Sequence, residues 1–136
     1  MSNFLENLPL AGVVSPSDIM LINQSGVSKK IPASSIFGFT FNYQTGISYA
    51  AVLADTSNVI IRMANAAVNL VTIPKDTLPV GACLILIQYG AGQSGFVGAS
   101  GVTLRNPSSN NCRMQYSTIA AIQDAANEWI LCGDLA

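Results

Sequence analysis

Residues 84–104 read LILIQYGAGQSGFVGASGVTL, and this stretch holds the pattern that decides the fold. Apolar runs at Leu84–Tyr89, Gly95–Val97 and Val102–Leu104 are separated by short breaks rich in glycine. Short apolar runs bounded by turn residues are typical of β-strands. The stretch therefore predicts three strands, with the glycines of residues 90–95 forming a β-turn between antiparallel neighbours.

The same pattern continues on both sides of this stretch. Further strands are expected at Ile47–Leu53, Val59–Met63, Val68–Ile73, Arg113–Tyr116, Thr118–Ile122 and Glu128–Cys132. Asparagine, aspartate, proline and glycine fill the breaks between them, and one break, Ala54–Ser57, could form a helical turn. Strands at this spacing predict that residues 47–136 form one all-β domain, a small antiparallel β-sandwich or barrel.

Residues 1–36 predict a separate arm. A hairpin is expected from Ile19–Ile22 and Val27–Ile31 around a turn at Gln24–Gly26, and Pro32 can open a short helix at Ala33–Phe37. The region is too small to hold a core of its own, so we interpret it as an attachment arm. Its apolar docking contacts would come from Leu8, Leu10, Ile19, Leu21, Val27 and Ile31.

Residues 37–46, FGFTFNYQTG, form an aromatic connector between the arm and the domain. Phe37, Phe39, Phe41 and Tyr43 recur at period two, so an extended strand places all four rings on one face. The favoured interpretation is a strip packed on the sheet or on a neighbouring subunit. The alternative is an exposed surface on which sugar rings stack. Trp129 has the same two interpretations, as a core or subunit-interface anchor or as a ligand-stacking ring.

The composition indicates self-association. Half of the 136 residues are hydrophobic and 10% are charged, whereas soluble domains carry about 25% charge. A domain of this size cannot hide so much apolar surface internally. Its longest apolar runs fall far short of the roughly 18 residues that span a bilayer. We therefore expect a homo-oligomer or a component of a larger assembly, without membrane insertion.

The charges and cysteines narrow the class of protein further. The net charge is −1 and the six basic residues are scattered, whereas nucleic-acid binders gather theirs on one face. We therefore expect no nucleic-acid partner. The amino terminus does not read as a secretory signal. Three widely spaced cysteines predict free thiols and folding in a reducing compartment.

Catalytic motifs are weak in this chain. There is no histidine, which removes the commonest general base and metal ligand. Gly90–Gly95 satisfies G-x-G-x-x-G, but the residues that follow are poor helix formers, and a dinucleotide site needs a helix there. The seven carboxylates show no pairing of the kind that glycosidases use. We predict no enzyme, no cofactor and no metal site.

The order of several short motifs resembles the carboxy-terminal modules of tailed-bacteriophage tail-fibre and tailspike proteins. The matching pieces, over about ninety residues, are Ala54-Asp55, Arg62-Met63, Val71–Pro74, Pro79–Gly81, Gln88 with Gly90–Gln93, Gly101–Leu104, Arg113 with Gln115–Ser117, Asn127–Trp129 and Gly133–Leu135. Leu8–Leu10 and Gly26–Lys30 are similar to amino-terminal attachment segments of phage structural proteins.

The resemblance implies a homotrimeric, β-rich virion protein that is made in the host cytoplasm and carries no catalytic residue. Its expected partners are itself, the baseplate, tail or capsid, and host surface polysaccharide. The short connector favours a short tail fibre that docks through its arm and binds glycans without cleaving them. A capsid decoration or head-fibre protein is the alternative, and a depolymerase is a third, less favoured hypothesis.

Overall fold

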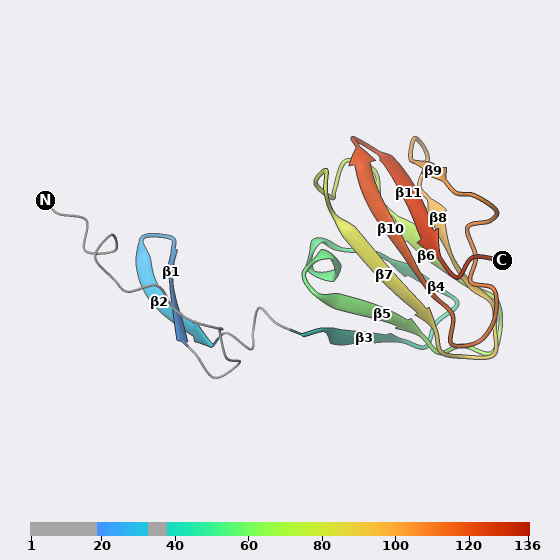
Figure 1. Ribbon diagram of the computed structural model, residues 1–136, viewed down its shortest axis with the longest axis horizontal. Coiled ribbons are helices and arrows are strands. Elements are labelled where there is room, and N and C mark those ends of the chain that lie inside the picture. Colours follow the sequence, from blue (N-terminus) through green and yellow to red (C-terminus); the bar gives the residue numbers. More distant parts are fainter. Residues whose placement is uncertain (1–18, 33–37) are drawn as a thin grey trace, which may run out of the picture. The chain divides into compact units, whose positions relative to one another are not determined.

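The computed structural model describes residues 19–32 and 38–136, which belong to two compact units (Figure 1). The first unit, within residues 1–38, holds an antiparallel hairpin of β1 (Ile19–Gln24) and β2 (Val27–Pro32). Ser25 and Gly26 both have positive φ, 54° and 78°, as a type I′ hairpin turn requires. The predicted hairpin is confirmed. The short helix expected at 33–37 lies outside the described residues.

In the second unit, residues 39–136, the chain winds alternately through two sheets. The large sheet receives β3 (Thr40–Gln44), β5 (Val59–Met63) and β7 (Cys83–Gln88), which pair in parallel. The small sheet receives β4 (Ser48–Ala50), β6 (Asn69–Ile73) and β8 (Ser94–Gly98), also in parallel. Each turn of the chain thus adds one strand to each sheet, which makes a β-solenoid of three coils (Figure 1). One turn of 3-10 helix, η3 (Leu53–Thr56), lies near the helical turn expected from sequence.

A hairpin closes the carboxy-terminal end of the large sheet. β10 (Thr118–Ala125) pairs antiparallel with β7 and with β11 (Glu128–Gly133), and β9 (Thr103–Arg105) pairs in parallel with β11. The strand order of this sheet is β3-β5-β7-β10-β11-β9. Repeat folds need such caps because each coil otherwise leaves an unpaired edge.

The all-β class is confirmed, but the antiparallel sandwich or barrel is wrong. The coils pair in parallel, and antiparallel pairing in the module is concentrated in the cap. The segment Arg113–Tyr116 is also not a strand. It forms a turn in which Ser117 donates its backbone N–H to the carbonyl of Met114 at 3.1 Å, with Tyr116 at a positive φ of 70°.

The glycine string Gly90–Gly95 is a corner of the solenoid and not a turn between antiparallel strands. It leads from β7 in the large sheet to β8 in the small one. The N–H of Gly90 donates to the Met63 carbonyl at 2.9 Å, and that of Gly92 to the Asn65 carbonyl at 3.1 Å. At this approach a Cβ on Gly90 or Gly92 would overlap backbone atoms of the preceding coil. The glycines are therefore required by the stacking of the coils.

The core fills the space between the two sheets. Its buried apolar side chains come from every coil and from the cap: Ala51, Ile61, Met63, Val71, Ile73, Leu78, Ala82, Leu84, Leu86, Phe96, Cys112, Ile119, Ala121, Trp129 and Leu131. Trp129 is among the largest fully buried side chains. Burying such a ring removes roughly 150–250 Å² from water, so Trp129 ties the cap to the coils.

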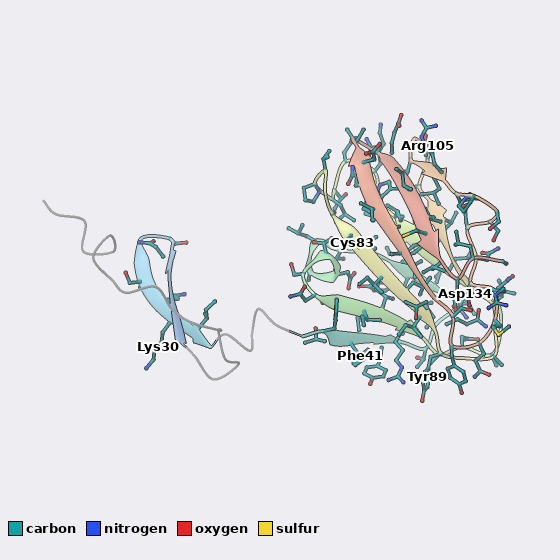
Figure 2. The ribbon with its side chains drawn as sticks, in the orientation of Figure 1. Lys30, Phe41, Cys83, Tyr89, Arg105 and Asp134 are labelled. Atoms are coloured by element: carbon teal, nitrogen blue, oxygen red, sulfur yellow. The ribbon has the colours of Figure 1, made fainter. Side chains whose placement is uncertain are left out.

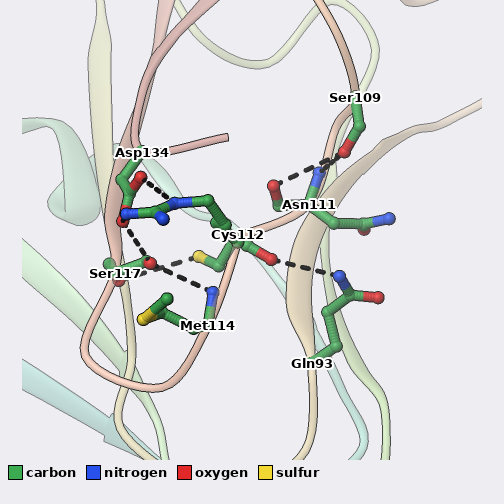
Figure 3. Close-up of polar contacts among 8 residues, drawn as sticks. Gln93, Ser109, Asn111, Cys112, Met114, Ser117 and Asp134 are labelled. Atoms are coloured by element: carbon green, nitrogen blue, oxygen red, sulfur yellow. Dashed lines mark hydrogen bonds and ion pairs between the residues drawn. The ribbon is translucent and has the colours of Figure 1, made fainter. Parts of the chain in front are cut away.

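The loop before β10 covers the edge of the small sheet (Figure 3). The Cys112 N–H donates to the Ser94 carbonyl at 2.8 Å, and the Gln93 side-chain amide donates to the Cys112 carbonyl at 3.1 Å. The Ser117 hydroxyl donates to Asp134 at 2.6 Å, and Asp134 also pairs with Arg113 at 2.7 Å. The loop is thus held to both β8 and the carboxy terminus.

The Cys112 thiol predicts a loss of stability at alkaline pH. Burial raises its pKa from 9.0 to about 11, so the folded state resists forming the thiolate. A raised pKa gives stability that is complete below pH 9 and is lost as the pH rises toward 11. We expect the wild-type chain to lose about 2 kcal/mol more unfolding free energy than Cys112→Ala between pH 8 and pH 11. Urea unfolding of both proteins at both pH values measures this, and equal losses would contradict it.

Candidate functional site

The large sheet is apolar on the face that points away from the core, here called the outer face. Register places its side chains in rows across the strands. The first row contains Phe39, Cys83, Ile122 and Ile130; Asn58 lines a hollow with Phe39 and Cys83, and Arg105 of β9 lies opposite Ile130. The second row contains Phe41, Ile60, Ile85, Ala120 and Cys132. An ordinary two-layer protein carries polar residues on such a face. Here both faces of the sheet are apolar, which is typical of a sheet that is covered on both sides.

The third row runs from Tyr43 and Arg62 to Ile87 and Thr118, and aromatic rings gather around Arg62. Tyr43 on β3 lies opposite Arg62 on β5, and the Arg62 guanidinium donates to the Tyr43 hydroxyl at 2.8 Å. The guanidinium carbon lies 3.6 Å from the centre of the Tyr89 ring, beyond the end of β7. Tyr116 packs edge-on against Tyr89 with 5.9 Å between ring centres. We call Tyr43, Arg62, Tyr89 and Tyr116 the tyrosine–arginine row.

The tyrosine–arginine row combines exposed rings with a cation held between them. Tyr43 and Tyr116 are 61% and 66% exposed, while Arg62 lies between the rings and fixes their spacing. Tyrosine rings joined by an arginine provide apolar contact, hydroxyl hydrogen bonds and cation–π attraction in one surface. Figure 2 shows the Phe41 and Tyr89 rings projecting at the same end of the module. Such a surface suits a sugar ring or another protein.

A buried polar cluster holds β3 in place. Asp55 is 2% exposed and accepts from the Asn42 amide at 2.8 Å, the Tyr49 hydroxyl at 2.8 Å and the Val52 N–H at 2.9 Å. Burial raises the pKa of Tyr49, and its hydrogen bond to Asp55 adds to that shift. Asn42 alternates with Phe41 and Tyr43 along β3. Its contacts therefore fix the orientation of the exposed rings.

The structure separates the residues that the sequence grouped as contacts. Phe39, Phe41 and Tyr43 are about half exposed on the outer face, so the period-two strip is confirmed for these three. Trp129 is 1% exposed in the core, where neither solvent nor a sugar reaches its ring. Phe37 lies outside the described residues. The connector range 37–46 contains β3, so it includes the first strand of the solenoid.

The predicted docking residues lie in or before the first unit. Leu8 and Leu10 fall outside the described residues, and Ile19 and Leu21 belong to β1. Val27 and Ile31 belong to β2, where Val27 is 57% exposed and Ile31 is half-buried. Sequence reasoning missed Arg62, Tyr89 and Tyr116. The parallel register places Arg62 beside Tyr43, Tyr89 packs on Arg62, and Tyr116 packs on Tyr89.

Residues 19–32 and 38–136 contain no group of three or more histidine, cysteine, aspartate or glutamate side chains arranged to hold a metal ion. Within the same ranges, no helix is long and apolar enough to cross a bilayer.

Comparison of the chain with protein-family models, curated proteins and solved structures gives no significant match.

Proposed function

We propose that this chain is a structural protein of a tailed-phage virion, a short trimeric tail fibre that docks through its amino-terminal arm. The observation that carries the proposal is the division of the chain into a hairpin unit and a capped β-solenoid. An attachment fibre needs a part that grips the particle and a stiff part that projects from it. The order of motifs in residues 49–136, which resembles phage fibre modules, supports the same assignment.

The tyrosine–arginine row supports non-catalytic binding of host surface glycans. Sugar rings present an apolar face that stacks on aromatic rings, and their hydroxyls can bond to tyrosine and arginine. Tyr43, Tyr89 and Tyr116 provide these groups around Arg62. This binding needs no acid, base or metal.

A capsid decoration protein is the second candidate. It is favoured by the extent of the apolar outer face, because a decoration protein uses most of its surface for packing. Gold-labelled antibodies against the chain distinguish the two on electron micrographs of particles that carry it. Label at the tail supports the fibre, and label over the head supports decoration. Particles without label would argue against both.

The arm gives a separate prediction. A chain lacking residues 1–38 keeps the whole second unit, so we expect its unfolding transition and far-ultraviolet circular dichroism to match those of the full chain's solenoid. We also expect it to lose attachment to particles that lack the protein. Co-sedimentation of the full and shortened chains with such particles measures this, and equal attachment of the two would show that the arm is not the docking segment.

A further inference from the structure

We infer that the first two rows of the outer face are the interface between copies of this chain. The inference rests on the trimer in the proposed function and deepens it by naming the surface that holds the trimer together. The two rows contain nine aromatic, aliphatic or cysteine side chains, from β3, β5, β7, β10 and β11 and from the residue before β3: Phe39, Phe41, Ile60, Cys83, Ile85, Ala120, Ile122, Ile130 and Cys132. Asn58, a polar residue, lines a hollow beside Phe39 and Cys83.

The two rows are large enough to form the centre of an interface. Five strands at about 4.8 Å spacing and two rows about 6.7 Å apart cover roughly 24 by 13 Å. This projection of about 310 Å² is a minimum, because half-exposed rings stand above the plane of the sheet. Phe39 and Phe41 alone, at 55% and 48% exposure, offer roughly 200 Å². Each partner in a stable interface gives about 800 Å², so the two rows provide its apolar centre and the residues around them its rim.

The apolar character of the outer face suits a second copy of the same face. The nine side chains of the two rows carry no charge, and both cations beside them are engaged. Arg62 lies against three aromatic rings within 5.3 Å, and Arg105, opposite Ile130, is paired with Glu128 at 2.9 Å. A nucleic acid or an anionic lipid surface would therefore have to compete with these contacts. The whole chain has a net charge of −1, so several copies can meet without strong repulsion.

The two edges of the sheet also complement each other in shape. Three exposed rings project along β3, at one edge. At the opposite edge a hollow of about 260 Å³ lies between β11 and the loop after β9, lined by Arg105, Asn106, Pro107, Ile130 and Leu131. A cavity of about 150 Å³ already accepts benzene, so this hollow can hold a phenyl or phenol ring. Rings at one edge and a hollow at the other allow a head-to-tail contact, which closes into a ring of copies.

The two edges of the large sheet are protected differently against association. β9 is short, carries the Arg105–Glu128 ion pair at 2.9 Å, and is followed by Pro107. Charges and proline are the usual protection of a sheet edge against association. β3 is longer and presents rings without a charge of its own. The unprotected edge therefore lies on the side where the apolar rows begin.

Thiol labelling tests the inference on the full wild-type chain. Cys132 is exposed in a single copy and belongs to the second row, whereas Cys112 is fully buried in the core. We expect light scattering to show a trimer in which iodoacetamide modifies Cys132 at least ten times more slowly than in the chain unfolded in urea. Cys112, followed by peptide mass spectrometry, reports whether the fold is intact.

A pair of matched variants locates the surface. Ile122 and Val97 are both exposed strand residues, at 42% and 37%, but Val97 lies on β8 in the small sheet. We expect Ile122→Asp to raise the dissociation constant at least 30-fold and to expose Cys132, because it buries a carboxylate in the interface. We expect Val97→Asp to leave the trimer unchanged.

The outcomes distinguish the claim of this interface from the claim of a trimer. A wild-type trimer with Cys132 freely reactive, or an Ile122→Asp trimer as stable as wild type, would overturn the interface while leaving the trimer standing. A wild-type monomer at micromolar concentration would remove the trimer itself, and with it that part of the proposed function.

Discussion

Replacing Gly92 with alanine is expected to destabilise the solenoid by about 3 kcal/mol or more, among the largest effects of any single methyl addition. The new Cβ would overlap the carbonyl oxygen of Ala67 in the preceding coil. Neither backbone can easily retreat, because Gly92 is hydrogen-bonded to Asn65 at 3.1 Å and the Asn69 N–H to the Gln93 carbonyl at 2.9 Å. The strain therefore spreads into the stacking of the coils.

Gly46 provides the matched control, because it lies at the corresponding corner of the first coil. A Cβ there meets its nearest neighbour, the Ser48 carbonyl oxygen, at 3.5 Å, an ordinary contact, and its φ is not positive. Gly46→Ala should be neutral or up to about 1 kcal/mol stabilising, through the entropy of the unfolded chain. Urea unfolding of both variants measures the difference. If Gly92→Ala proved as stable as Gly46→Ala, the coils would not be stacked as closely as the structure shows.

The sequence predicted the strands well because each is a local apolar run. Val59–Met63 was predicted with the observed bounds, and the strands near Asn69, Cys83 and Glu128 within about one residue. The prediction failed at Arg113–Tyr116, where the Ser117 hydroxyl accepts from the Met114 N–H and the Ser117 N–H donates to the Met114 carbonyl, which favours a turn. That competition is invisible in a count of apolar residues.

The pairing of the strands could not be predicted in the same way. The coils begin at Thr40, Val59 and Cys83, so their lengths differ and no repeat marks the solenoid. One signal was present, however. The runs VIIRM and CLILIQ lack the alternation of apolar and polar residues that is expected when one face of an antiparallel sheet is exposed to solvent. Continuous apolar runs are typical of parallel strands. Glycine in alternate positions of GAGQSG was a second signal, of close backbone approach.

Only the part of the site that lies along a single strand was predicted from the sequence. Phe39, Phe41 and Tyr43 follow one another along a strand, so their common face could be read from a period of two. Arg62, Tyr89 and Tyr116 come from three other segments: the parallel register places Arg62 opposite Tyr43, and tertiary contacts then bring Tyr89 onto Arg62 and Tyr116 onto Tyr89. Trp129 shows the converse limit, since a tryptophan in a strand looks the same in sequence whether it faces the core or a ligand.

Replacing Asp55 with alanine is expected to cost about 3–5 kcal/mol and to release β3 from the solenoid. The carboxylate accepts three hydrogen bonds in a buried site, from Asn42, Tyr49 and the Val52 N–H. Its removal leaves those donors without their acceptor, and each buried unpaired group costs about 1–3 kcal/mol. Asp124→Ala is the control, because Asp124 is an exposed aspartate on β10, where truncation should change stability by less than about 0.5 kcal/mol.

Amide hydrogen exchange shows which strands Asp55→Ala destabilises. β3 is the edge strand of the large sheet, pairs only with β5, and carries Phe41 and Tyr43. With Asn42 no longer anchored, we expect the amides of Thr40–Gln44 to exchange at least tenfold faster, while the amides of β10 and β11 change less. Uniform acceleration over the whole module would instead mean that Asp55 supports global stability alone. Loss of protection confined to β3 would establish that this cluster holds the aromatic rings on the outer face, and therefore that the buried carboxylate serves the contact surface.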